Sequence, residues 1–112
     1  MIIPLNGDDL GVYRNENHTV VEWTDLVHRV VFSATRHGNA MSCHFASGKN
    51  GIRYIKQAIN EFVEFIFNAC KWCEIVVAIT EKKGVINTIK QCGFFLCASA
   101  DNGLHLYARG RT

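Results

Sequence analysis

A run of small residues stands directly before the longest amphipathic segment of this chain. The run from Ser47 to Gly51 reads SGKNG, and helical periodicity continues from it to Cys70. Small residues allow backbone N–H groups to close around an anion, and the start of a helix leaves unpaired N–H groups that favour negative charge. The sequence therefore predicts that a ligand of this protein meets the N-terminus of this helix.

The five cysteines are the other residues that could carry chemistry. Cys70 and Cys73 have the C-x-x-C spacing, and Cys92 and Cys97 follow at a distance that a zinc ribbon could use. Such ribbons place their cysteine pairs on tight turns, whereas Cys70 is expected to close a helix and Cys73 to open a strand. We expect reduced, mostly buried thiols and no metal site; the alternative is a zinc site formed by the four later cysteines.

Length and composition are those of one globular domain spanning residues 1–112. The hydrophobic fraction is 48%, the charged fraction is 20% and the net charge is +2. These values argue against disorder, and the charge is too mild to indicate nucleic-acid binding. No apolar run is long enough to span a membrane, and the first residues lack the pattern of a signal peptide. We therefore expect a cytoplasmic protein.

The first part of the chain has the composition of strands. Thr19–Trp23 predicts one strand, most of Leu26–Thr35 predicts a second, and Ala40–Ala46 predicts a third, with a turn at Arg36–Asn39 between the last two. A helix over Asp25–Arg36 is the alternative for the middle segment. The residues before Thr19 are weakly patterned.

A long helix and four further elements follow. Cys73–Thr80 is almost continuously apolar, which predicts a central strand, covered on both faces and parallel to a neighbour. Glu81–Gln91 predicts a shorter helix that ends at Gly93, and Phe94–Ala98 and Leu104–Ala108 predict a closing hairpin. The apolar stripe of the long helix recurs at steps of three and four residues: Ile52, Ile55, Ile59, Phe62, Ile66 and Ala69.

The strand run Ile75–Ile79, the short helix and the corner Cys92-Gly93-Phe94 precede the closing hairpin. Over residues 19–112 this order resembles the GNAT N-acetyltransferase family, whose second helix commonly ends in a Leu-Gly-Phe-like corner. The chain also looks like the small GNAT-like proteins of tailed phages. The resemblance implies an α+β (or α/β) fold with a mixed central sheet, one long and one short helix (β-hairpin–α–β–α–β-hairpin), and reduced N-terminal helices.

In that family acetyl-CoA lies between the fourth and fifth strands, which here correspond to Ala40–Ala46 and Glu74–Thr80. Its pyrophosphate sits at the start of the long helix, so the resemblance assigns any cofactor contact to Lys49, Asn50, Gly51, Ile52 and Arg53. The family has a small residue where Arg53 stands. Its side chain can reach an anion or fill the volume that the pyrophosphate needs, and we expect obstruction.

The resemblance also indicates where catalytic groups would stand. Family members often protonate the departing thiolate with a tyrosine at the position of Ile89, which donates no proton. In family members an asparagine at the start of the second helix frequently contacts the cofactor or the substrate, and in this chain Lys82 stands near that position. The candidates for a general base are Glu22, His44 and Glu81. Each also has a structural interpretation: Glu22 facing solvent, His44 as a core or edge histidine, and Glu81 as a first-turn helix residue.

We therefore expect a non-catalytic GNAT-like protein with an assembly, virion-associated or regulatory binding role and no cofactor. Its partner would be another protein or a second copy of this chain, in the cytoplasm or in the virion of an infected bacterial host. The first alternative is an acetyl-CoA-dependent N-acetyltransferase. The second is a zinc-stabilised binding module.

Overall fold

The computed structural model describes residues 1–48 and 51–111. Within those ranges the chain forms strands β1 (Ile2–Pro4), β2 (Thr19–Thr24), β3 (Arg29–His37), β4 (Ala40–Ser47), β5 (Ile75–Thr80), β6 (Phe95–Ser99) and β7 (His105–Gly110). Its helices are α1 (Ile55–Ala69), preceded by the 3-10 turn η1 (Gly51–Tyr54), and α2 (Lys83–Lys90).

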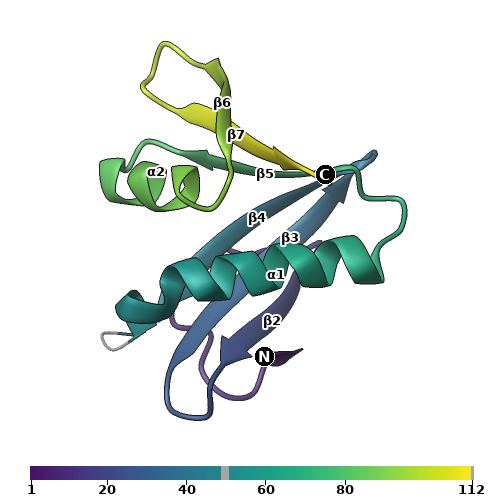
Figure 1. The fold of residues 1–112 in the computed structure, drawn as a ribbon, viewed down its shortest axis with the longest axis vertical. Helices are drawn as coiled ribbons and strands as arrows, with labels where there is room; N and C mark the ends of the chain where they lie inside the picture. The colour runs from purple at the N-terminus through teal and green to yellow at the C-terminus, as the bar shows by residue number, and fades with distance from the viewer. Residues whose placement is uncertain (49–50, 112) are drawn as a thin grey trace.

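The strands form one mixed sheet in the order β1-β2-β3-β4-β5-β7-β6 (Figure 1). Neighbouring strands are antiparallel except β4 and β5, which are parallel and are connected through α1. The expected order of hairpin, helix, strand, helix and hairpin is therefore confirmed. So is the interior position of β5 in the sheet, with β4 as its parallel neighbour.

Helix α1 packs its apolar stripe on the first half of the sheet and lies across β2, β3 and β4 (Figure 1). Phe62 of α1 stacks on Phe32 of β3, with ring centroids 4.2 Å apart. The residues that α1 buries follow the helical spacing: Ala58, Ile59, Phe62, Val63, Ile66 and Phe67. This layer forms the main hydrophobic core.

The C-terminal end of α1 is bound by the side chain of Arg111, which follows β7. The Arg111 guanidinium donates to the carbonyl oxygens of Phe67 at 2.9 Å, Cys70 at 3.0 Å and, through Nε, Cys73 at 3.0 Å. Carbonyls at the end of a helix have no partner within the helix, and a guanidinium can serve several of them at once. These contacts hold the C-terminal end of α1 beside the first residues of β5.

The opposite sheet face of β2–β4 is covered by the irregular segment 5–18. Val12 in this segment is buried, and the Ser33 hydroxyl of β3 donates to the backbone carbonyl of Tyr13. The segment contains no helix, as the expectation of reduced N-terminal helices requires.

Helix α2 covers β5 from the same side as α1. Ile89 and Cys92 are buried, and Gly93 follows with φ +86°, as expected for a left-handed helix stop. Phe94 is buried, whereas Phe95 on the edge strand β6 is exposed. No helix in the described ranges is long and apolar enough to cross a membrane.

The expected strand over most of Leu26–Thr35 is confirmed as β3, and one expectation about β5 is wrong. β3 begins at Arg29, because the Asp25 carboxylate accepts hydrogen bonds from the N–H groups of Val27 and His28 and closes a turn. The same turn excludes the alternative helix. β5 is not covered on both faces, since Ile79 is 48% exposed.

Candidate functional site

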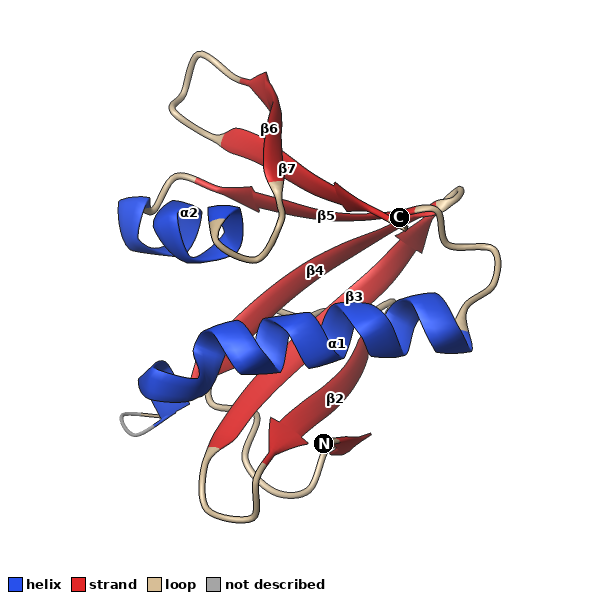
Figure 2. Cartoon of the chain, viewed as in Figure 1, coloured by secondary structure: helices blue, strands red, loops and turns tan. Residues whose placement is uncertain are grey.

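The two central parallel strands pair only over their first residues and then diverge. Ala40–Ser42 pairs with Ile75–Val77, whereas β4 continues to Ser47 and β5 to Thr80. Figure 2 shows the two arrows separating toward their C-terminal ends. The sheet therefore opens in its middle instead of at an edge.

A cleft of about 530 Å³ occupies this opening. It is lined by residues 43–47 of β4, residues 78–80 of β5, residues 11–13 of the irregular segment, and Lys82 and Val85 at the start of α2. A cleft of this size can hold part of a cofactor or a small ligand.

Unpaired backbone groups form the two edges of the cleft. The Asn39 carbonyl accepts a hydrogen bond from the Glu74 N–H, so odd-numbered residues of β4 direct their backbone groups toward β5. Backbone direction alternates along a strand, so beyond the last pair the C=O of Cys43 and both the N–H and C=O of Phe45 face the cleft. The edge of β4 is thus open to an extended ligand that carries amide groups.

His44 lies on the cleft wall, on the sheet face opposite α1. Its ring centroid is 4.8 Å from that of Tyr13 and 5.9 Å from that of His18. Burial, and the nearby His18 ring, lower the pKa of His44 below its ordinary 6.5. At neutral pH the imidazole is therefore uncharged and able to accept a proton.

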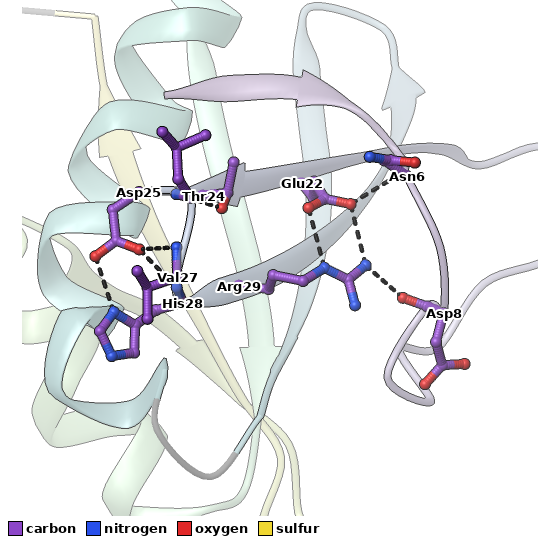
Figure 3. A network of polar contacts seen from close by, with 9 residues as sticks. Asn6, Asp8, Glu22, Thr24, Asp25, Val27, His28 and Arg29 are labelled. Carbon is purple, nitrogen blue, oxygen red and sulfur yellow. Dashed lines mark hydrogen bonds and ion pairs between the residues drawn. The ribbon is translucent and has the colours of Figure 1, made fainter.

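Glu22 does not line the cleft, and the expectation that it faces solvent is wrong. It is 2% exposed, because segment 5–18 covers its side of the sheet. Arg29 donates to both carboxylate oxygens at 3.0 Å, and the Asn6 N–H donates at 2.8 Å (Figure 3). The Arg29 hydrogen bonds hold the pKa of Glu22 below its usual value. Glu22 is therefore a structural ion-pair partner.

The start of α2 brings a cation, not a carboxylate, to the cleft. Glu81 is exposed and is not among the lining residues, whereas Lys82 lines the cleft as the residue before the first turn. The Lys82 N–H donates to the Thr80 hydroxyl at 3.1 Å, which fixes the corner between β5 and α2. Of the three expected base candidates, the structure brings only His44 to the cleft.

The segment expected to contact a cofactor is described only in part. Lys49 and Asn50 lie outside the described residues, while Gly51 and Ile52 belong to η1, at the same end of the sheet as the wide end of the cleft. Arg53 is exposed and is not among the cleft-lining residues. The expected obstruction of the pyrophosphate volume by Arg53 stays a prediction.

The cysteines do not form a metal site within the described ranges. Cys73 and Cys92 are buried, Cys97 is exposed on β6, and no group of three or more His, Cys, Asp or Glu side chains is placed to hold a metal ion in residues 1–48 and 51–111. Burial raises the pKa of the Cys73 and Cys92 thiols above the usual value. These thiols are suited to packing and not to nucleophilic chemistry.

Sequence reasoning missed the wall formed by Val12 and Tyr13. Segment 5–18 has neither helical nor strand periodicity, and its position depends on long-range contacts such as that between Ser33 and the Tyr13 carbonyl. No local pattern in the sequence could have placed Tyr13 beside His44.

A seven-stranded mixed sheet, opened between two parallel central strands and covered by one long and one short helix, defines the GNAT-like α+β fold. Solved structures confirm it. An acetyltransferase from Bacillus subtilis in complex with CoA matches with a TM-score of 0.69 at 12% identity, over 87% of this chain and 79% of that one. The N-acetyltransferase PseH from Campylobacter jejuni matches with a TM-score of 0.70 at 12% identity, over 88% and 71%.

A mutant of the spermidine N-acetyltransferase SpeG from Vibrio cholerae matches with a TM-score of 0.65 at 8% identity, over 86% of this chain and 67% of that one. At these identities the likeness establishes the fold alone. No protein-family model matches the sequence, and no curated protein matches it in sequence.

Proposed function

We propose that this protein is an acetyl-CoA-dependent N-acetyltransferase that works in the cleft between β4 and β5, with His44 as its general base. The observation that carries the proposal is the cleft itself, which opens between the two central strands and has an uncharged histidine on its wall. The solved acetyltransferases with the same fold, one of them in complex with CoA, support it.

The chain offers suitable contacts for such a cofactor. The free edge of β4 at Cys43 and Phe45 suits an extended chain with amide groups, because such a chain can hydrogen-bond to a strand edge. The N-terminal end of α1 with η1, and Lys82 before α2, suit the phosphate groups. Acetyl-CoA would supply an acetyl thioester to this site.

His44 supplies the proton acceptor that the reaction needs. An amine attacks only in its unprotonated form and loses a proton when it becomes an amide, so a neutral base within reach speeds the reaction. The lowered pKa keeps His44 uncharged at neutral pH. Its ring lines the cleft together with that of Tyr13, and the His18 ring lies next to it.

The absence of a proton donor at Ile89 is compatible with this chemistry. Ile89 is buried in the core and 1% exposed, so it takes no part in the cleft. A thiol has a pKa of about 8.5, so a thiolate leaves readily at neutral pH and can take its proton from water. We therefore expect a slower enzyme and not an inactive protein.

A non-catalytic protein-binding domain is the second candidate. It is favoured by Ile89 at the position of the acid and by the exposed apolar side chains of Phe95 and Leu96 on β6. In this case a protein partner would occupy the exposed surface, and acetyl-CoA would not bind.

Calorimetric titration with acetyl-CoA distinguishes the two candidates. We expect a dissociation constant in the micromolar range, and Ala46→Trp, which fills the cleft wall, should weaken binding at least tenfold. Ala100→Trp places the same side chain on the exposed turn between β6 and β7 and should leave the affinity unchanged. Binding weaker than about a millimolar in the native chain would favour the non-catalytic role.

A further inference from the structure

The sheet face that carries His44 continues as an uncovered apolar surface. Residues paired across neighbouring strands share a face, which places Val77, Ala108 and Phe95 together and Ile79 beside Leu106. Val77 also pairs with Ser42, two residues before His44 and on the same face. Segment 5–18 covers this face over β2–β4 only.

Side chains on this surface are apolar and accessible. Phe95 is 56% exposed and Ile79 48%, while Val77 and Leu106 are half-buried. Ile79 also lines the cleft, so the surface begins at the cleft and extends across β5, β7 and β6. We call Val77, Ile79, Phe95 and Leu106 the apolar floor.

The cleft offers no carboxylate to a cationic ligand. None of the described residues that line it is acidic, and Lys82 adds a positive charge. Asp9 and Glu81, which stand next to lining segments in the sequence, are not among the lining residues. Asp9 accepts the Gly11 N–H and pairs with Arg14 at 3.3 Å, and Glu81 is exposed outside the lining.

We propose that the acyl acceptor is a monoamine with an apolar, aromatic-sized body, which lies on the apolar floor while its amine reaches His44. This inference rests on the proposed function. Two observations carry it: the floor is continuous with the cleft, and the cleft lacks the negative charge that a polyamine needs. The acceptor class therefore differs from spermidine, which is named for one of the solved structures with this fold.

NMR titration of the CoA-loaded full chain with phenethylamine, and separately with spermidine, tests the inference. We expect amide shifts at Val77, Ile79, Phe95 and Leu106 with phenethylamine, and a dissociation constant at least tenfold lower than that of spermidine. Ile79→Glu should weaken phenethylamine binding at least tenfold and strengthen spermidine binding. Val27→Glu changes an apolar side chain that is 80% exposed in the β2–β3 turn and should change neither affinity.

Equal or tighter binding of spermidine would overturn the inference, as would shifts confined to other regions or the absence of phenethylamine binding. Sedimentation of the native chain and of the Ile79→Glu variant tests whether a second copy of this chain, instead of an acceptor, occupies the apolar floor. A native dimer that the substitution converts to a monomer would mean that a second copy covers the floor. Failure of the proposed function is recognised separately, by the absence of CoA-induced shifts at residues 43–47 and 78–80.

Discussion

At the scale of single residues, position relative to the cleft distinguishes the candidates for the general base. His44 and Glu22 both lie on the face opposite α1, but Glu22 is two strands away from the cleft and is neutralised by Arg29. His44 borders the cleft, and its lowered pKa keeps its ring uncharged at neutral pH. Segment 5–18 therefore buries the Glu22 carboxylate and lies beside the His44 ring.

The pH dependence of acetyl transfer should report on His44. Protonation of the amine substrate already lowers kcat/KM as the pH falls, and the base works only in its neutral form, so kcat/KM should fall more steeply below the pKa of His44, which lies below the ordinary 6.5. His44→Gln should lower kcat/KM about 100-fold and remove this additional fall, leaving only the slope caused by the amine. The measurement is a pH–rate profile with acetyl-CoA and phenethylamine. His37→Gln, at the exposed end of β3, should keep both rate and profile; a His44→Gln variant that keeps them would remove His44 from the reaction.

The Glu22–Arg29 ion pair should contribute to stability. Arg29→Met leaves the Glu22 carboxylate buried without its partner, and we expect a loss of about 3 kcal/mol in urea unfolding at neutral pH. The pKa of Glu22 is lowered in the folded state, so this contribution is present above the usual value of 4.5 and is lost as the pH falls through the lowered pKa.

The matched control for this pair is an exposed one. Arg14 pairs with Asp9 at 3.3 Å and is 45% exposed, so Arg14→Met should change stability by less than about 0.5 kcal/mol. Equal costs for the two substitutions would show that the Glu22–Arg29 pair is not effectively buried.

At the scale of elements, the parts that the sequence predicts well are those with a local cause. The stripe of α1 follows from its periodicity, and the end of α2 from Gly93. The exposed face of β5 could not be predicted, because an apolar run does not say which of its faces a helix will cover. The turn at Asp25–His28 was missed because its valine and leucine have strand composition.

Two glycines at opposite ends of α2 should respond to alanine in opposite directions. Gly93 has φ +86°, where a Cβ is strained, so Gly93→Ala should cost about 1 kcal/mol. Gly84 lies inside α2 with nothing within 4 Å of an added Cβ, so Gly84→Ala should stabilise the protein by about 0.5 kcal/mol. Urea unfolding of both variants measures this, and a stabilising Gly93→Ala would contradict the role of Gly93 as a helix stop.

At the scale of the whole molecule, the sequence predicts the order of the elements but not how far the central strands pair. The resemblance to the GNAT fold located the cleft between β4 and β5. Its walls, however, depend on segment 5–18, on the length of the β4–β5 pairing and on exposed Ile79, none of which has a local signal. For the same reason His44 could be named as a candidate but not chosen over Glu22 and Glu81.

Amide hydrogen exchange should show the open strand edge directly. In the free chain the N–H group of Phe45 faces the cleft beyond the last β4–β5 pair, whereas those of Ser42 and His44 face β3. We expect Phe45 to exchange at least tenfold faster than His44, because its N–H has no strand partner. Saturation with acetyl-CoA should slow Phe45 at least tenfold and leave His44 almost unchanged, since a ligand that adds to the strand edge protects only the groups on that side. Exchange measured residue by residue by NMR tests both statements. Equal protection of Phe45 and His44 in the free chain would mean that β4 and β5 are paired along their whole length and that the cleft is closed.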